Sequence, residues 1–355
     1  MRLSRRTFLV GTAATLAAVP AARSQSLTAV RLTLPWIPHG GFTHHFVAKK
    51  LGLWDKRGLD VKIDRGFGSG EVCKTLGLGQ YEFGEMDFGV MTNCVGKGLD
   101  LVGLGLIQPK ATMGIFALAR KGIRRPADLE GRKVGFATGS GDFQLWPAFV
   151  KLTGIDDGKV QKVLMGPETL IKSLIEEQID AEGNFYGSLA PSVWAQGLDL
   201  TTMLYADHGV QIYGLGLATR PRVVKEQPEL CAKFVDGVME AMAWTYLNPE
   251  QAIDIHLDMV KEFKGSVTNR EVIKHGQGVR TAMALVPEFE KQGLGAFDPA
   301  MVQRTRETVM AYMGAKDVPP ADQLFTNAFT GKTQLTTAQW AQVRDSVKRY
   351  IPARA

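Results

Sequence analysis

The chain has 355 residues, of which 45% are hydrophobic and 22% are charged, with 42 Lys and Arg against 36 Asp and Glu. This length exceeds what one hydrophobic core usually covers, so we expect two lobes. Four of the six formal positive charges lie in residues 1–26, and the +2 that remains gives no support for nucleic-acid binding.

Residues 1–26 have the organisation of an export signal. Residues 4–9 read SRRTFL, which resembles the twin-arginine signature, and residues 8–19 are rich in Ala, Leu and Val. That apolar run is shorter than the about 20 residues that a membrane span needs, but it suits a signal-peptide core. We therefore expect a twin-arginine-type signal peptide over residues 1–26, with two small-residue cleavage sites open as alternatives, and a periplasmic location. No later stretch has the length and apolar content of a membrane span.

The first strand–loop–helix–strand unit occupies residues 31–63. Apolar residues alternate at the start, prolines and glycines then interrupt the chain, and a helical pattern begins at Phe42. The loop carries Trp36, His39 and Phe42, which are large side chains for a plain connection. In open α/β sheets ligands bind beyond the carboxyl ends of the strands. This loop therefore predicts one wall of a binding cleft.

Strands and helices alternate along the rest of the chain until about residue 228, after which only helices are expected. The pattern predicts an α/β fold with mainly parallel sheets. Two crossings, near residues 113–119 and 213–219, predict two lobes with a ligand cleft between them. We assign residues 27–114 and 217–355 to lobe I, and residues 115–216 to lobe II.

A Gly-rich loop in the expected second lobe follows a strand and leads into a helix. Such a loop presents free backbone N–H groups and the positive end of the helix to a ligand. Thr138, Ser140 and Gly141 are therefore candidate ligand-binding residues. The alternative interpretation is simple N-capping by Ser140 or Asp142. The spacing matches neither a dinucleotide fingerprint nor a phosphate-binding loop.

Trp36 and Phe42 are candidates for stacking on a planar ligand, although aromatic residues near a helix start are often core residues. His39 is a candidate hydrogen-bonding residue of the cleft. With His44 and His45 it also suggests a metal cluster, but no acid or cysteine lies at ligand spacing in the sequence, so we expect no metal site.

Short polar residues follow several expected strand ends, as is typical of a site for a small polar molecule. These candidates are Ser69, Thr92, Asn93, Gln108, Asn184 and Tyr186, each of which could instead be a turn residue. Thr92 and Asn93 are expected in a loop. No nucleophile–base arrangement is evident, so we expect neither an enzyme nor a cofactor. The three cysteines are expected to be buried thiols, with a bridge between Cys73 and Cys94 as the alternative.

Several blocks of the sequence resemble a known family. Residues 36–38, 46–54 and 58–61 are similar to the opening of the periplasmic substrate-binding proteins for nitrate, sulfonates and thiamine-pyrimidine precursors. Residues 87–90 and 128–135 are similar to later blocks of that family, in the same order. The resemblance implies a type II periplasmic-binding fold, a small-molecule ligand held between the lobes, and an ABC permease as partner. It also implies a monomer.

Within that family Trp36 and residues 108–109 look most like the branch that binds pyrimidine precursors. That branch often carries a carboxylate after an Asn–aromatic pair, whereas Tyr186 and Gly187 follow Asn184 and Phe185 here. We therefore expect a receptor for a small planar heterocyclic or aromatic compound. A receptor for an aliphatic sulfonate or a nitrate-type anion is the first alternative. A pyrimidine-forming enzyme is the second, although the Cys-rich stretch of such enzymes is missing from this sequence.

Overall fold

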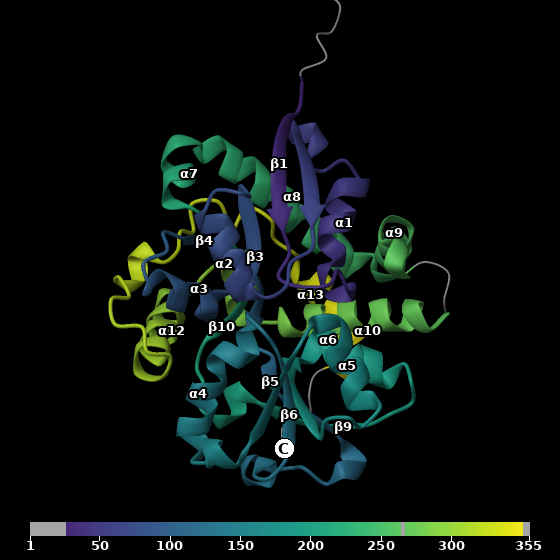
Figure 1. The fold of residues 1–355 in the computed structure, drawn as a ribbon. Helices are drawn as coiled ribbons and strands as arrows, with labels where there is room; N and C mark the ends of the chain where they lie inside the picture. Colours follow the sequence, from purple (N-terminus) through teal and green to yellow (C-terminus); the bar gives the residue numbers. More distant parts are fainter. Residues whose placement is uncertain (1–25, 264–266, 351–355) are drawn as a thin grey trace, which may run out of the picture.

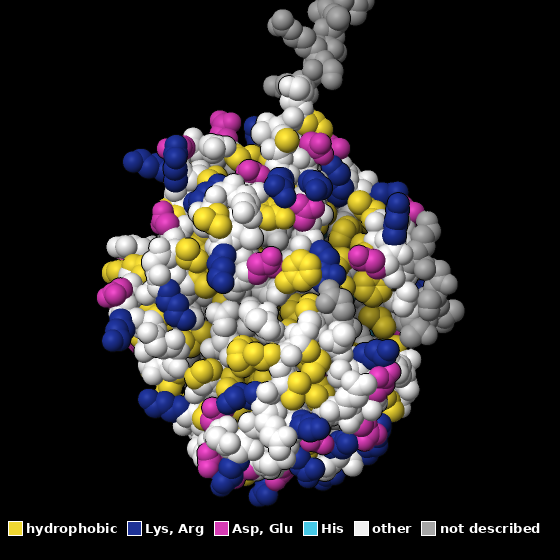
Figure 2. Space-filling view, in the orientation of Figure 1, with side chains coloured by type: hydrophobic (Ala, Val, Ile, Leu, Met, Phe, Trp, Pro, Cys, Tyr) yellow, Lys and Arg dark blue, Asp and Glu magenta, His cyan; other side chains and the backbone are white. Residues whose placement is uncertain are grey.

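The computed structural model describes residues 26–263 and 267–350, so the expected export signal, except for Ser26, lies outside the described residues. No helix in these two ranges is both long enough and apolar enough to cross a membrane. Two sheets form two lobes, one above the other in Figure 1. Positive and negative side chains are interspersed over the face shown in Figure 2, in keeping with a small net charge.

Lobe I is built on a five-stranded sheet with the strand order β2-β1-β3-β10-β4. Its strands are β1 (Thr28–Thr33), β2 (Leu59–Asp64), β3 (Phe83–Asp87), β4 (Val102–Lys110) and β10 (Tyr213–Thr219). Strand β1 pairs in parallel with β2 and β3, whereas β10 runs antiparallel to both β3 and β4.

Lobe II repeats this pattern with the strand order β7-β6-β8-β5-β9. Its strands are β5 (Met113–Leu118), β6 (Lys133–Ala137), β7 (Gln161–Met165), β8 (Ala181–Phe185) and β9 (Leu200–Leu204). Strand β6 is parallel to β7 and β8, and β5 is antiparallel to β8 and β9.

Both sheets are mixed: four of the five strands in each run in one direction, which agrees with the expectation of mainly parallel sheets, and one strand runs in the opposite direction. In each sheet the antiparallel strand is the one that the chain enters directly from the other lobe: β5 follows β4, and β10 follows β9. The chain also crosses slightly earlier than expected. Met113 already belongs to the sheet of lobe II, and Tyr213 to the sheet of lobe I.

Helices cover both sheets and continue as a helical tail. In lobe I and lobe II they are α1 (Thr43–Lys50), α2 (Ser69–Gly77), α3 (Phe88–Val95), α4 (Gly141–Thr153), α5 (Pro167–Ile175) and α6 (Tyr186–Trp194). The tail consists of α7 (Pro221–Glu226), α8 (Pro228–Leu247), α9 (Pro249–Met259), α10 (Val267–Met283), α11 (Pro287–Gln292), α12 (Pro299–Tyr312) and α13 (Thr337–Val347). Helix α10 lies between the two lobes and packs on α6 (Figure 1).

The core of lobe I is a stack of aromatic rings between its sheet and the tail. Phe83 of β3 stacks on Phe234 of α8 with ring centroids 3.9 Å apart, and Trp54 stacks on the same Phe234 at 5.6 Å. The indole N–H of Trp54 donates to the backbone carbonyl of Phe234. Such rings bury large apolar areas and pack with defined geometry, so they fix the tail helix α8 against the sheet that carries the first candidate loop.

The segment after β3 corrects a second expectation. Residues 88–95 form helix α3 rather than a loop, with Asp87 as its N-cap. Thr92 and Asn93 are therefore buried helical residues. The three cysteines, all in the described part of the chain, are unpaired and buried.

Candidate functional site

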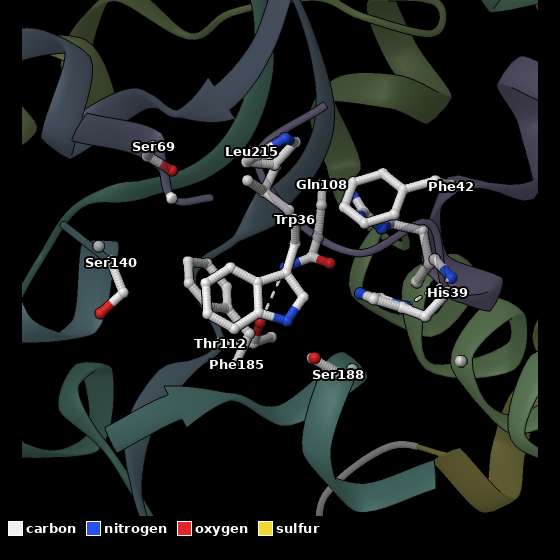
Figure 3. Close-up of a pocket in the computed structure, with 17 residues that line it drawn as sticks. Trp36, His39, Phe42, Ser69, Gln108, Thr112, Ser140, Phe185, Ser188 and Leu215 are labelled. Atoms are coloured by element: carbon white, nitrogen blue, oxygen red, sulfur yellow. Dashed lines mark hydrogen bonds between the residues drawn. The ribbon is translucent and has the colours of Figure 1, made fainter. Parts of the chain in front are cut away.

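A cavity lies between the two lobes, where the strand ends and helix starts of both sheets meet (Figure 3). Its volume is about 30 Å³, which is room for one or two water molecules. A larger solute therefore does not fit the cavity as it stands in this structure. The cavity is lined by Pro35, Trp36, His39, Gly41, Phe42, Gly68, Ser69, Gln108, Thr112, Ser140, Gly141, Phe185, Gly187, Ser188, Leu215, Gly276 and Arg280.

Trp36 occupies the centre of the cavity in Figure 3, with Phe185 behind it and Ser188 facing it from lobe II. The loop after β1 carries Trp36, and the carbonyl of the preceding Pro35 accepts a hydrogen bond of 2.8 Å from the N–H of Gly68. This contact joins the loop to the start of α2. The indole lines the cavity and is only 9% exposed.

His39, Phe42 and Arg280 form the side of the cavity that belongs to lobe I and the tail. The ring of His39 lies 4.7 Å from that of Phe42, and the guanidinium of Arg280 lies 5.0 Å from the centre of the Phe42 ring, within cation–π distance. Nδ1 of His39 accepts the N–H of Gly41 at 3.0 Å. Burial, helped by the charge of Arg280, lowers the pKa of His39 to about 3. His39 is therefore neutral at physiological pH.

The charge of Arg280 is balanced within the protein. Its guanidinium donates to Oε1 of Glu85 at 2.8 Å, and both side chains are buried. Arg280 and the two nearby histidines, His44 and His45, hold the pKa of Glu85 well below its usual value against the opposing effect of burial. Among the described residues that line the cavity, none is acidic and Arg280 is the only charged one. The cavity thus offers no carboxylate partner to a cationic ligand.

The first turns of three helices line the cavity. They are α2 at Ser69, α4 at its N-cap Ser140 and at Gly141, and α6 at Gly187 and Ser188. The free N–H groups and the positive end of a helix favour carbonyl oxygens or anions at this position. In Figure 3, Ser69 and Ser140 lie on one side of Trp36, and His39 and Phe42 lie on the other.

Gln108 and Thr112 line the cavity at the point where the chain crosses from lobe I to lobe II. The amide of Gln108 donates to Oγ1 of Thr112 at 2.9 Å and to the carbonyl of Lys110 at 3.0 Å. Both donors of the Gln108 amide group are therefore used, and its oxygen remains as an acceptor. These bonds fix the crossing segment next to the cavity.

Two buried acids lie near the start of α4: Asp142 in its first turn and Glu182 on β8. Burial raises the pKa of Asp142 to about 7 and, with the charge of Asp142 beside it, that of Glu182 to about 8. Oε1 of Glu182 accepts from the amide of Asn184 at 2.7 Å, and the hydroxyl of Tyr205 donates to the backbone carbonyl of Asp142. Oδ2 of Asp142 and Oε2 of Glu182 have no hydrogen-bond partner in the described parts of the chain.

Seven of the predicted site residues line the cavity, and five do not. Trp36, His39, Phe42, Ser69, Gln108, Ser140 and Gly141 line it. The structure places Thr92, Asn93, Thr138, Asn184 and Tyr186 elsewhere. Thr92 is bonded to the carbonyl of Phe88 within α3, and Thr138 is exposed at the end of β6. Tyr186 packs against Trp194 with the rings edge to face.

Phe185 lines the cavity, whereas the predicted site residue Asn184 does not. Successive residues of a strand point to opposite faces, so Asn184 shares the face of Glu182 and bonds to it, while Phe185 faces the cavity. A short polar stretch of sequence does not show which face of the strand each residue occupies. Arg280 was also missed, because it lies on a helix of the tail more than 200 residues after the first loop.

Comparisons with known proteins give a consistent picture. The family model described as NMT1/THI5 like matches residues 40–252. Among curated proteins, a binding protein of Brucella abortus is 28% identical over 244 residues, covering 64% of this chain and 74% of that protein. The riboflavin-binding protein RibY of Chloroflexus aurantiacus is 24% identical over 331 residues, covering 89% and 90%.

A third relative is named as an enzyme. The 4-amino-5-hydroxymethyl-2-methylpyrimidine phosphate synthase of Legionella pneumophila is 24% identical over 249 residues, covering 66% of this chain and 74% of that protein. Among solved structures, the alkanesulfonate-binding protein SsuA of Xanthomonas axonopodis bound to MOPS has a TM-score of 0.65 at 13% identity, with 84% of this chain and 98% of that chain covered. The fold is therefore the two-lobed α/β periplasmic-binding fold.

Proposed function

Since the chain belongs to the NMT1/THI5-like family, we propose that it is a periplasmic solute receptor that binds a small planar aromatic compound with a carbonyl or anionic edge. The receptor delivers this ligand to an ABC import permease. The proposal draws on the named functions of its relatives, which are mostly binding proteins, and on the expected export signal at residues 1–26.

The observation that carries the proposal is the position of Trp36 between aromatic walls and helix starts. Its indole lies in the cavity together with Phe42 and Phe185, and aromatic faces favour planar ligands by stacking. The first turns of α2, α4 and α6 would meet electronegative atoms at the edge of such a ligand. None of the described residues that line the cavity is acidic, which disfavours a ligand with a cationic ring.

One observation favours a second candidate, an aliphatic sulfonate. Three helix starts around one cavity suit an oxyanion without any aromatic group, and the similar structure of SsuA is that of an alkanesulfonate-binding protein. In that case Trp36 would only pack against an aliphatic chain. The two candidates differ in whether the aromatic face of Trp36 contributes to affinity.

A thermal-shift and calorimetry panel tests the proposal. The signal-free protein is mixed with uncharged pyrimidines, riboflavin, aromatic carboxylates, alkanesulfonates and nitrate. A ligand that binds only the folded state stabilises it by about 2.7 kcal/mol at a hundredfold excess over its Kd. We expect a rise in Tm with planar compounds. A rise with alkanesulfonates or nitrate alone would favour the second candidate, and turnover of a bound compound would contradict a pure receptor.

A further inference from the structure

Two adjacent histidines of α1 and one glutamate of β3 meet in the interior of lobe I. Nε2 of His45 lies 2.7 Å from Oε2 of Glu85, and Nε2 of His44 lies 3.6 Å from the same oxygen. All three side chains are at most 4% exposed, and their candidate ligand atoms lie within 4.8 Å of one another. Donors bound at about 2.0–2.2 Å to one ion are at most about 4.4 Å apart, so small side-chain adjustments would bring all three to a common ion.

The hydrogen bonds of this cluster are incomplete. Nε2 of His44 and Nδ1 of His45 have no hydrogen-bond partner in the described residues, and burying a polar atom without a partner is costly. A bound ion would use the Nε2 lone pairs of both rings. His45 would then carry its proton on Nδ1, which has no partner in either tautomer, so the ion would cost His45 only its hydrogen bond to Glu85.

A small cavity adjoins His44. Its volume is about 10 Å³, and Gly40, Gly41, Thr43, Ile107, Thr245, Tyr246, Gln277, Arg280 and Thr281 line it together with His44. Oγ1 of Thr245, the hydroxyl of Tyr246 and Oε1 of Gln277 have no hydrogen-bond partner among the described residues, and each of these side chains is more than nine-tenths buried. The space is close to that of one water molecule, which is what a metal site with three protein ligands keeps at its open position.

We propose that His44, His45 and Glu85 bind one divalent transition-metal ion of the zinc or iron(II) class, with a water molecule toward the small cavity. Two imidazoles and one carboxylate are the ligand set that these ions use when one or more positions remain open. Arg280 donates to the other carboxylate oxygen, Oε1, at 2.8 Å. It therefore orients Glu85 so that Oε2 faces the histidines, as groups that contact metal ligands commonly do.

Charge works partly against this site. The guanidinium of Arg280 repels a cation nearby, and Glu85 is the only carboxylate in the group. The bonds of the ion to two imidazole nitrogens, one of which (Nε2 of His44) has no hydrogen-bond partner in the described residues, would have to offset that repulsion. His44, His45 and Glu85 do not line the cavity between the lobes, although Arg280 contacts both places. The proposed metal site does not depend on the proposed receptor function.

Metal analysis of the folded protein tests the site without any organic ligand. Untagged, signal-free protein is stripped with a chelator, dialysed against Zn²⁺, Fe²⁺ (anaerobically) or Co²⁺, and analysed by elemental mass spectrometry. We expect close to one equivalent per chain with at least one of these ions. We also expect the intense visible absorption of low-coordinate Co²⁺ and a rise in Tm on loading. Which ion binds most tightly distinguishes the zinc from the iron(II) class.

The variant His44→Gln is the decisive one, because it removes a ligand and leaves the Glu85–His45 and Glu85–Arg280 contacts in place. We expect a loss of at least tenfold in metal affinity, with a native circular-dichroism spectrum. The control is His208→Gln, since His208 contacts Phe149 in lobe II and should not change the stoichiometry. Substoichiometric metal in the wild type, or unchanged binding by His44→Gln, would overturn the proposal.

Discussion

The backbone N–H of Gly70, in the first turn of α2 in lobe I, donates a hydrogen bond of 3.3 Å to the carbonyl of Gly139 in lobe II. The side-chain amide of Gln144, on α4, donates to the same carbonyl. The neighbouring Gly68 has a φ of +129°, a conformation that side chains disfavour, and a Cβ there would lie 2.5 Å from that carbonyl oxygen. The two lobes therefore meet through glycines at the edge of the ligand cavity.

Gly70→Val should hinder closure of the lobes. A Cβ at this position would lie 2.4 Å from Nε2 of Gln144 and 3.1 Å from the carbonyl oxygen of Gly139, so the valine displaces the Gln144 side chain and crowds the Gly139 carbonyl in the closed arrangement. We expect a larger radius of gyration by small-angle X-ray scattering in the presence of ligand, and about tenfold weaker binding. The control is Gly77→Ala at the other end of α2, where the new Cβ meets only the Leu99 side chain at 3.3 Å. Equal scattering curves for Gly70→Val and wild type would contradict the idea.

Two substitutions of Trp36 separate stacking from packing. Trp36→Leu keeps an apolar side chain but removes the aromatic face. Trp36→Phe keeps an aromatic face, although a smaller one. For a planar ligand found in the panel, we expect a loss of tenfold or more in Trp36→Leu, which corresponds to about 1.4 kcal/mol. The loss in Trp36→Phe should be clearly smaller. Calorimetric titration measures both, and equal affinities would assign Trp36 a purely structural role and favour a sulfonate ligand.

The stability of the protein should fall as the pH rises from about 6.5 to 8.5. The folded-state pKa values of Asp142 and Glu182 are raised to about 7 and about 8. The contribution of these two carboxyl groups to the free energy of unfolding is complete below their pKa values in the unfolded chain. It is lost as the pH rises through their pKa values in the folded protein. Buried imidazoles such as His39 and His256, with pKa values lowered to about 3, oppose this trend only below about pH 6.5.

Urea denaturation across this pH range measures the effect. Each acid that keeps its proton only in the folded state gives a slope of up to about 1.4 kcal/mol per pH unit. In the double variant Asp142→Asn, Glu182→Gln, neither group titrates, so the fall above pH 6.5 should become shallower. A double variant with the same slope as the wild type would show that these carboxyl groups are ionised in the folded protein.

Arg280→Met should destabilise the protein strongly. The substitution leaves the buried Glu85 without its cationic partner, and removing one member of a buried ion pair costs about 3–5 kcal/mol. The matched control is Arg222→Met, because Arg222 pairs with Glu226 on the surface of α7 with both side chains at least half exposed. Exposed pairs contribute little, so the urea midpoint of the control should stay close to that of the wild type. Similar midpoints for both variants would contradict the importance of the buried pair.

The local sequence determined the alternation of strands and helices and the positions of the candidate loops. The strand, turn and helix signals around Trp36 and Ser140 are encoded within about ten residues, and ligands collect where strands end and helices begin in such folds. Trp36, Phe42, Ser69 and Ser140 could therefore be selected from the sequence, and the structure places them at one cavity. Their contact with a ligand remains a prediction.

Other features depended on the tertiary structure because they join distant segments. The register of β8 between β5 and β6 decides on which face of the sheet Asn184 and Phe185 each lie. A shift of one residue in that register would exchange their faces. The antiparallel course of β5 and β10 follows from how the chain enters each sheet, which local patterns do not encode. Arg280 reaches the cavity only because α10 packs between the lobes.

His44 and His45 of α1 show most clearly the difference between what local sequence predicts and what depends on the fold. The local pattern predicted a helix that contains His44 and His45, and the absence of a nearby acid in the sequence argued against a metal site. Only the fold brings Glu85, 40 residues later on β3, to 2.7 Å from His45. Bringing distant side chains together costs chain entropy, and the burial of apolar surface elsewhere in the lobe offsets this cost. The proximity of Glu85 to the two histidines therefore depends on the whole lobe and not on local sequence.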